Sequence, residues 1–220
     1  MSDGDVDPTA AGGDADPSPE AGTDGTEPEP DRPPDVPEWD DEFLDEVATR
    51  LMFNYDLEKD YTVDGRRFGL YGRMDMHHEK HFLHPALSFA HHDSYEHVFA
   101  RRADGVRRRD VDALLELGHD LADEWIDANE EHYSTDFTFA LVTDAVPDDL
   151  AEFVSEFRER TMIKRGYYGH YEVHLVLVAP GDERVVASRE AHLADAFRLW
   201  DPIEEGEPSW WDLITRRLQL

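Results

Sequence analysis

Apolar residues recur at intervals of three and four in four segments of the chain, a spacing that places side chains on one face of a helix. The segments predicted to be helical are 40–55, 110–129, a stretch that begins at Pro147, and 189–199. Asp40 and Asp41 stand where acidic side chains favour a helix N-terminus, and Asp110 is the expected N-cap of the longest helix. Gly118 lies on the apolar stripe of that helix, where the missing side chain allows a close approach to a sheet.

Strands are predicted between these helices, from alternating or continuous apolar residues. They span 66–76, 80–90, 95–101, 137–142, a long strand or hairpin over 162–179, and a short strand at Val185 and Val186. Short polar connections among the first three predict an antiparallel meander. The order α-βββ-α-β-α-ββ-α predicts an α+β domain over 38–200, with a single mixed, largely antiparallel sheet of about six to seven strands and flanking helices.

Both ends of the chain differ in composition from this domain. Residues 1–36 contain no aromatic side chain, and they hold eleven acidic residues against one arginine. Such a segment buries too little apolar surface to offset the entropy of ordering, so we expect a disordered acidic tail. Residues 201–220 are expected to form an acidic linker and a short C-terminal helix that carries Trp210 and Trp211.

Acidic residues dominate the folded part as well as the tail. The chain has 52 Asp and Glu against 21 Lys and Arg, which gives a net charge of −31, and the tail contributes −10 of it. The only lysines are Lys59, Lys80 and Lys164. Acid excess with scarce lysine indicates a protein of a salt-accumulating halophile, because high salt screens the repulsion between acidic side chains. The alternative is an ordinary acidic protein.

The composition also bears on the cellular compartment. Cysteine is absent, which excludes disulfides and thiol chemistry. The sequence starts without the basic and apolar regions of a signal peptide, and it has no apolar run of the ~20 residues that cross a bilayer. We therefore expect a cytoplasmic protein that makes no membrane contact.

Four short segments carry a resemblance to a small domain family of archaea and some bacteria. They are 68–73 (FGLYGR), 79–83 (EKHFL), 95–99 (YEHVF) and 171–178 (YEVHLVLV). The resemblance covers about 44–197 and excludes both ends of the chain. The family has no assigned activity, so the resemblance implies a fold and no catalytic residues.

Histidine is concentrated in one part of the chain. Seven of the twelve histidines fall between His77 and His97, and imidazole is the commonest metal ligand in proteins. On a strand, His77, Glu79 and His81 would share one face and hold a divalent metal together with a ligand from a later strand. The alternative is a set of surface histidines in a lysine-poor protein.

The predicted order of elements also resembles the restriction-endonuclease-like core, in which acids on the second and third strands bind Mg²⁺ and activate water. Asp75 and Glu96 are the candidates for those acids. Val98 occupies the position of the lysine that the pattern requires, so a degenerate relative fits better than an active nuclease. The pattern predicts metal-dependent hydrolysis at a site where these acids converge with at least one of His77, His81 or His97.

Basic residues cluster just before the 110–129 helix. The clustered arginines are Arg101, Arg102, Arg107, Arg108 and Arg109. Arginine suits phosphate or carboxylate groups and a helix N-terminus also favours anions, so the cluster predicts a site for a phosphate-bearing ligand. The alternative is neutralisation of the acidic surface by ion pairs. Nucleic acid is disfavoured as the ligand, because the net charge of −31 repels it.

The last candidate site is the C-terminal segment. Exposed aromatic side chains on a short helix are typical anchors for a protein partner, which predicts a contact at Trp210 and Trp211; the alternative is packing on their own domain. No catalytic motif is complete in the sequence. The leading hypothesis is therefore a non-catalytic binding or regulatory module of a halophilic cytoplasm, without a cofactor. The alternative is a metal-dependent hydrolase, restriction-endonuclease-like and degenerate.

We predict that the folded state weakens sharply below molar KCl. A net charge of −21 remains on residues 37–220, and unscreened repulsion between these charges opposes a compact state. The melting temperature, followed by circular dichroism, should rise steeply between 0.1 M and 3 M KCl. An unchanged melting temperature across this range would contradict the halophilic interpretation.

Overall fold

The computed structural model describes residues 32–79 and 91–201. Its α-helices are α1 (Glu42–Leu51), α2 (Arg108–Trp125) and α3 (Asp148–Glu156). Its strands are β1 (Asp56–Val63), β2 (Arg66–Glu79), β3 (His91–Arg102), β4 (His132–Val142), β5 (Arg160–Met162), β6 (His170–Ala179) and β7 (Arg184–Ala187). Short 3-10 helices span Ile163–Gly166, Pro180–Asp182 and His192–Phe197, the last of which is η3. Within the described ranges, no helix has the length and apolar character needed to span a membrane.

The described strands form one mixed sheet in the order β1-β2-β3-β4-β6-β5. β7 also pairs with β6, so β5 lies beside the start of β6 and β7 beside its end. β3, β4 and β6 run parallel, and the other pairs are antiparallel. Parallel neighbours need a crossover connection, and α2 and α3 lie in these connections. The predicted α+β fold with a mixed, largely antiparallel sheet is confirmed.

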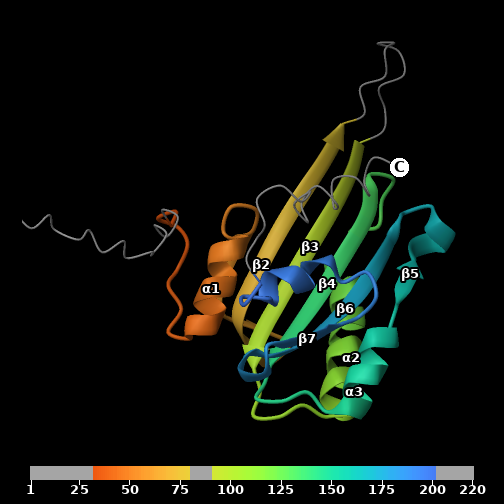
Figure 1. Ribbon diagram of the computed structural model, residues 1–220. Coiled ribbons are helices and arrows are strands. Elements are labelled where there is room, and N and C mark those ends of the chain that lie inside the picture. Colours follow the sequence, from red (N-terminus) through yellow and green to blue (C-terminus); the bar gives the residue numbers. More distant parts are fainter. Residues whose placement is uncertain (1–31, 80–90, 202–220) are drawn as a thin grey trace, which may run out of the picture. The chain divides into compact units, whose positions relative to one another are not determined.

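The sheet separates two hydrophobic cores (Figure 1). On one face, α1 and η3 cover the strands, and Leu51 is fully buried there. On the other face, α2 and α3 cover the strands, and Leu114 is buried there. Successive residues of β6 alternate between the two cores, with Val176 on the α1 side and Leu175 on the α2 side. The central strands are therefore buried on both faces, as is usual for parallel strands.

Some elements differ from the sequence prediction. β1 is absent from the prediction because it is a sheet-edge strand in which apolar residues alternate with exposed charged ones. The segment 189–199 contains η3 in place of the predicted α-helix, because the backbone leaves the helical region at Glu190 (φ 68°) and at Arg198. Asp110 is not the N-cap of α2; its carboxylate accepts a hydrogen bond from the backbone N–H of Arg107 at 2.9 Å. The strand predicted over 80–90 lies outside the described residues.

Arg32, near the start of the described residues, is bonded to α1. Arg32 falls in the tail expected over 1–36, but its guanidinium donates two hydrogen bonds to the Asp45 carboxylate of α1, at 2.8 and 2.7 Å. It also donates to the carbonyl oxygen of Pro37 at 2.7 Å. A bidentate ion pair therefore anchors residues next to α1 that have few apolar side chains.

Gly118 lets α2 lie close to the sheet. A Cβ atom added at this position would lie 2.8 Å from a methyl carbon of Val173 in β6 and 3.2 Å from the ring of Phe139 in β4. Both neighbours are buried, and a valine side chain has little rotational freedom. The close approach expected from the position of this glycine on the apolar stripe is therefore present.

We predict that Gly118→Ala destabilises the protein by about 1 kcal/mol. Overpacking a core costs about 1–3 kcal/mol, which outweighs the gain of about 1 kcal/mol in helix propensity. In a Val173→Ala background the contacts shorter than 3.0 Å are removed and the contact of 3.2 Å to Phe139 remains, so Gly118→Ala should no longer destabilise. Denaturant unfolding of the four proteins at constant KCl measures both effects. Stabilisation by Gly118→Ala in the wild-type background would show that α2 does not depend on this contact.

Candidate functional site

A cavity of about 470 Å³ opens on the α2 face of the sheet, beside the end of α2. Ligand pockets usually have volumes of about 300–1,000 Å³. Its aromatic walls are Tyr61 from β1, Tyr71 from β2, Tyr95 from β3 and Trp125 from α2. His132 and Thr135 of β4 also line it, so four strands and one helix end contribute to a single pocket, which we call the aromatic pocket.

The rings of the aromatic pocket are held in fixed orientations by one another. Tyr61 stacks on Tyr71, with ring centroids 4.1 Å apart and an interplanar angle of 17°. Trp125 meets the ring of Tyr71 edge-on at 6.4 Å. Tyr95 lies nearly parallel to the imidazole of His132, with an angle of 11° between the planes. Such contacts favour defined ring positions, so the rings hold one another in place along the pocket wall.

His97 lies at the inner side of the aromatic pocket. Only 7% of its surface is exposed, its ring stacks on Phe137 at 5.2 Å, and its Nδ1 is 2.9 Å from the hydroxyl oxygen of Tyr71. Burial, assisted by the positive charge of Arg73, lowers the pKa of His97 to about 4. Burial also raises the pKa of Tyr71 well above its usual range. Both side chains are therefore neutral at pH 7.

His132 is a second neutral imidazole in the pocket wall. Its Nδ1 lies 2.7 Å from the carbonyl oxygen of Tyr168, which can only accept, so Nδ1 carries the proton and donates it. Its Nε2 then accepts from the hydroxyl of Thr135 at 2.8 Å. Burial lowers the pKa of His132. The two bonds fix the ring orientation and leave the pocket wall uncharged at this position.

Charged side chains near the pocket are paired. Arg73 donates two hydrogen bonds to Asp75, each of 2.7 Å, and the Nδ1 of His77 lies 2.8 Å from a carboxylate oxygen of Asp93. That hydrogen bond raises the pKa of His77. Arg73, Asp93 and Asp127 line the pocket, so its wall offers one positive and two negative groups. Across residues 32–79 and 91–201, no cluster of three or more His, Asp or Glu is placed to hold a metal ion.

The structure separates the acids of the predicted metal site. Asp75 is the register partner of Tyr95, and Glu96 is the partner of Met74. Successive residues of a strand point to opposite faces, so Asp75 lies on the α2 side of the sheet and Glu96 on the α1 side. There Glu96 accepts a hydrogen bond of 2.5 Å from the hydroxyl of Tyr55. The prediction that Asp75 and Glu96 share one metal ion is therefore wrong.

A row of carboxylates, which the sequence did not predict, lies on the α1 side of the sheet. Glu96, Asp136 and Glu172 are register neighbours on β3, β4 and β6. Glu172 is fully buried, and Arg160 donates to it from Nε at 2.8 Å. Burial and the charges of Glu96 and Asp136 raise the pKa of Tyr55. The signal in the sequence is an acid at a core-facing position of an otherwise apolar strand, which is costly unless the charge is compensated.

The predicted anion site is divided by the structure. Four of its members, Arg101, Arg102, Arg107 and Arg109, line a second cleft. Arg108 is not among the lining residues; it donates to Asp112 at 2.7 Å and its guanidinium lies 3.5 Å from the centre of the Phe153 ring. The other predicted site residues, His81, Trp210 and Trp211, lie outside the described residues.

These features define a class of protein: an α+β domain with a mixed sheet that is buried on both faces and an aromatic pocket beside one helix end. The model of the family described as Domain of unknown function (DUF8052) matches residues 40–199, and the chain belongs to that family. The match confirms the resemblance to an uncharacterised domain family over about 44–197. No curated protein and no solved structure matches the chain.

We predict that His97 makes the protein less stable in mild acid. The unfolded chain takes up a proton at this histidine near pH 6.5, whereas the folded protein does so near pH 4. The free energy of unfolding should therefore fall by about 3 kcal/mol between pH 6.5 and pH 4 because of this group alone. Denaturant unfolding at constant KCl should show a shallower loss between pH 7 and pH 5 for His97→Gln than for the wild type.

His77→Gln is the matched control for this experiment. His77 is exposed, and its hydrogen bond to Asp93 raises its pKa in the folded state. Its contribution to the free energy of unfolding is therefore present at low pH and is lost as the pH rises. His77→Gln removes this contribution, so its free energy of unfolding should fall slightly more steeply in acid than that of the wild type. Equal slopes for the wild type and His97→Gln would contradict the depressed pKa of His97.

Proposed function

We propose that the protein is a non-catalytic binding module of a high-salt cytoplasm, and that its aromatic pocket takes a small planar molecule with an aromatic ring. The observation that carries this proposal is the cavity of about 470 Å³ between preoriented rings from three strands and α2. Concave pockets with convergent polar groups and side chains of shifted pKa are frequent locations of ligand sites.

Ring geometry supports an aromatic ligand. Tyr61 and Tyr95 come from different strands. The ring of Tyr61 is nearly parallel to that of Tyr71, and the ring of Tyr95 is nearly parallel to that of His132. Trp125 closes the same cavity from the end of α2. Aromatic pairs prefer offset-stacked or edge-on contacts, which add about 0.5–1.5 kcal/mol beyond the area that they bury.

The polar groups of the pocket support a ligand with hydrogen-bonding groups on its edge. Arg73, Asp93 and Asn129 belong to the lining together with the apolar side chain of Ile126. A few polar groups in a mainly aromatic wall fix the orientation of a ligand and supply its specificity. The neutral histidines add no charge, and Arg73, Asp93 and Asp127 leave an excess of one negative charge in the lining. The pocket therefore suits an uncharged or weakly cationic ring.

The metal-dependent hydrolase is the weaker alternative. It requires Asp75 and Glu96 to converge on one ion, but they lie on opposite faces of the sheet. The carboxylates in the lining of the aromatic pocket are Asp93 and Asp127, and Asp93 is hydrogen-bonded to His77. We therefore base the proposed function on ligand binding.

We predict that fused-ring heteroaromatic compounds bind in this pocket. A panel of such compounds, with saturated-ring analogues of equal size, would be screened by saturation-transfer NMR in molar KCl. Loss of one stacking contact in Tyr95→Leu should raise the dissociation constant of a bound compound about threefold to tenfold. Tyr133→Leu is the matched control, because Tyr133 is on the neighbouring strand, is 38% exposed and does not line the pocket.

The outcomes separate the proposal from nonspecific binding. Binding of aromatic compounds that weakens in Tyr95→Leu and not in Tyr133→Leu supports it. If no compound binds, if saturated analogues bind equally well, or if both variants weaken binding to the same extent, the pocket is not the ligand site. Circular dichroism of each variant establishes that it is folded.

A further inference from the structure

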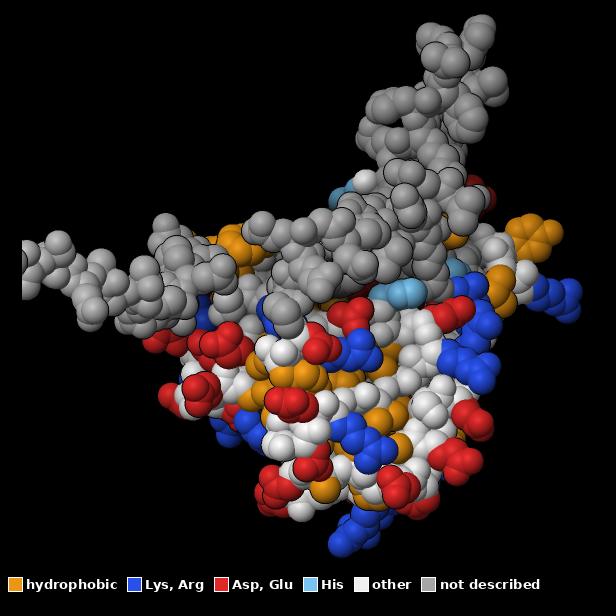
Figure 2. All heavy atoms as spheres, in the orientation of Figure 1, with side chains coloured by type: hydrophobic (Ala, Val, Ile, Leu, Met, Phe, Trp, Pro, Cys, Tyr) orange, Lys and Arg blue, Asp and Glu red, His pale blue; other side chains and the backbone are white. Residues whose placement is uncertain are grey.

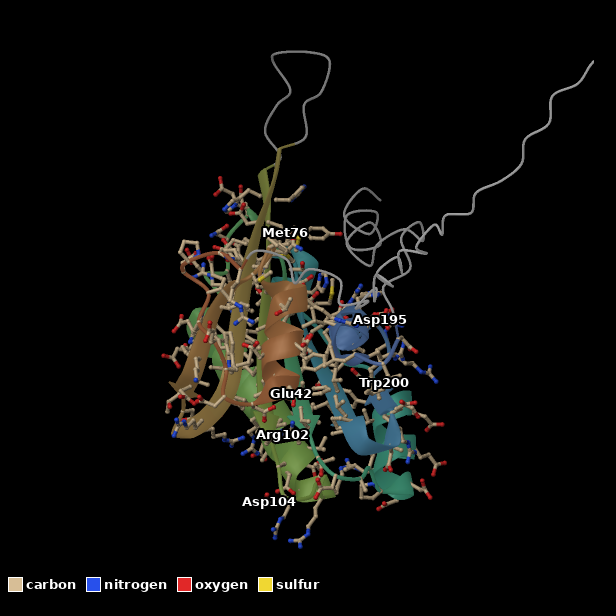
Figure 3. All side chains as sticks on the ribbon, turned by 60° about the vertical axis from the view of Figure 1, so that its left-hand side comes forward. Glu42, Met76, Arg102, Asp104, Asp195 and Trp200 are labelled. Atoms are coloured by element: carbon tan, nitrogen blue, oxygen red, sulfur yellow. The ribbon has the colours of Figure 1, made fainter. Side chains whose placement is uncertain are left out.

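A second cleft, of about 530 Å³, lies where β3 and β4 end and α2 begins. Its walls include the four arginines Arg101, Arg102, Arg107 and Arg109, and the residue before α3, Pro147. Figure 3 shows Arg102 and Asp104 at this end of the sheet and Met76 near the other end. The aromatic pocket lies beside the far end of α2, so the two sites are separate. We call this second site the arginine cleft.

Among the residues that the structure describes, two guanidinium groups of the arginine cleft have no acidic partner. Acids outnumber bases by 52 to 21 in the chain, and acidic and basic side chains are interspersed over the face shown in Figure 2. Arg102 follows this pattern, with hydrogen bonds of 2.6 and 2.9 Å to Asp41. By contrast, the side chains of Arg101 and Arg107 make no hydrogen bond or ion pair with any residue of the described ranges. The positive charges of Arg101 and Arg107 are therefore not neutralised by an ion pair within the described residues.

The side chain of Arg101 points most directly to a missing acceptor. Its Nε is buried and has no hydrogen-bond partner in the part of the chain that the structure describes. Its guanidinium carbon lies 6.0 Å from the centre of the Phe68 ring, a contact that holds the charged group in place. Buried N–H groups are almost always hydrogen-bonded in native proteins, so an acceptor is expected in the cleft.

The acids of the cleft leave its charge positive. Asp104 and Asp110 line it together with the four arginines. Asp110 accepts from the backbone N–H of Arg107 at 2.9 Å and lies 3.6 Å from the Nε of Arg109. The cleft therefore keeps an excess of positive charge.

We propose that the arginine cleft binds the phosphate group of a small molecule. Arginine presents a planar fork of N–H donors that matches phosphate oxygens. The cleft lies at the first turn of α2, an 18-residue helix whose dipole also favours an anion there. The proposal is independent of the aromatic pocket, because it rests on different residues at the other end of α2.

The test follows the Nε–H signal of Arg101 by ¹H–¹⁵N NMR while inorganic phosphate replaces chloride at constant ionic strength. Arg101→Lys assigns the signal by removing it. The signal should shift with saturation, because a phosphate oxygen becomes the acceptor of this N–H. The double variant Arg107→Gln/Arg109→Gln should raise the apparent dissociation constant for phosphate at least tenfold. This variant retains Arg101, so the same Nε–H signal reports binding.

Arg165→Gln/Arg189→Gln is the matched control. It removes the same charge from two exposed arginines that do not line the cleft, and phosphate affinity should stay within twofold of the wild type. Equal weakening in both double variants would show nonspecific attraction and overturn the proposal, as would the absence of a saturable shift. If a single-stranded oligonucleotide shifts the Arg101 signal at lower concentrations than phosphate or pyrophosphate does, the cleft is a nucleic-acid site and not a site for a small molecule.

Discussion

The parallel pairing of β3, β4 and β6 determines where both candidate sites lie. Parallel strands need crossovers, and α2 must therefore run back along the sheet from the end of β3 to the start of β4. Its N-terminus then lies beside the arginine cleft and its last residue, Trp125, beside the aromatic pocket. Gly118 maintains this arrangement by allowing the helix to touch Val173. The two sites are consequences of one crossover.

Local patterns in the sequence predict the elements of this fold better than they predict its sites. The stripe of α2 and the role of Gly118 follow from spacing alone, whereas β1 escapes notice because one face of it is exposed. The aromatic pocket combines Tyr61, Tyr95 and Trp125 from three elements that only the strand register brings together. The arginine cluster was visible because its members are close in sequence, but separating Arg108 from the other four required the helix geometry.

The same limitation explains the incorrect metal site. Asp75 and Glu96 have the right types and the right strands, but metal binding also requires a common face. The register that pairs Asp75 with Tyr95 places Glu96 in the opposite layer, where it joins the carboxylate row with Asp136 and Glu172. A shift of one residue in strand register moves every side chain of the strand to the opposite face of the sheet. Correctly predicted strands therefore do not establish which side chains share a face.

High salt limits the kinds of recognition that such a protein can use. At 1 M salt the Debye length is about 3 Å, so a charged patch attracts little beyond direct contact. Stacking on Tyr61, Tyr95 and Trp125 does not depend on long-range attraction, and hydrophobic burial does not weaken with salt as ion pairing does. An anion in the arginine cleft would likewise depend on a direct hydrogen bond to the buried Nε of Arg101. Both proposed sites therefore act at contact distance, which is the range that remains effective in the high-salt cytoplasm that we propose.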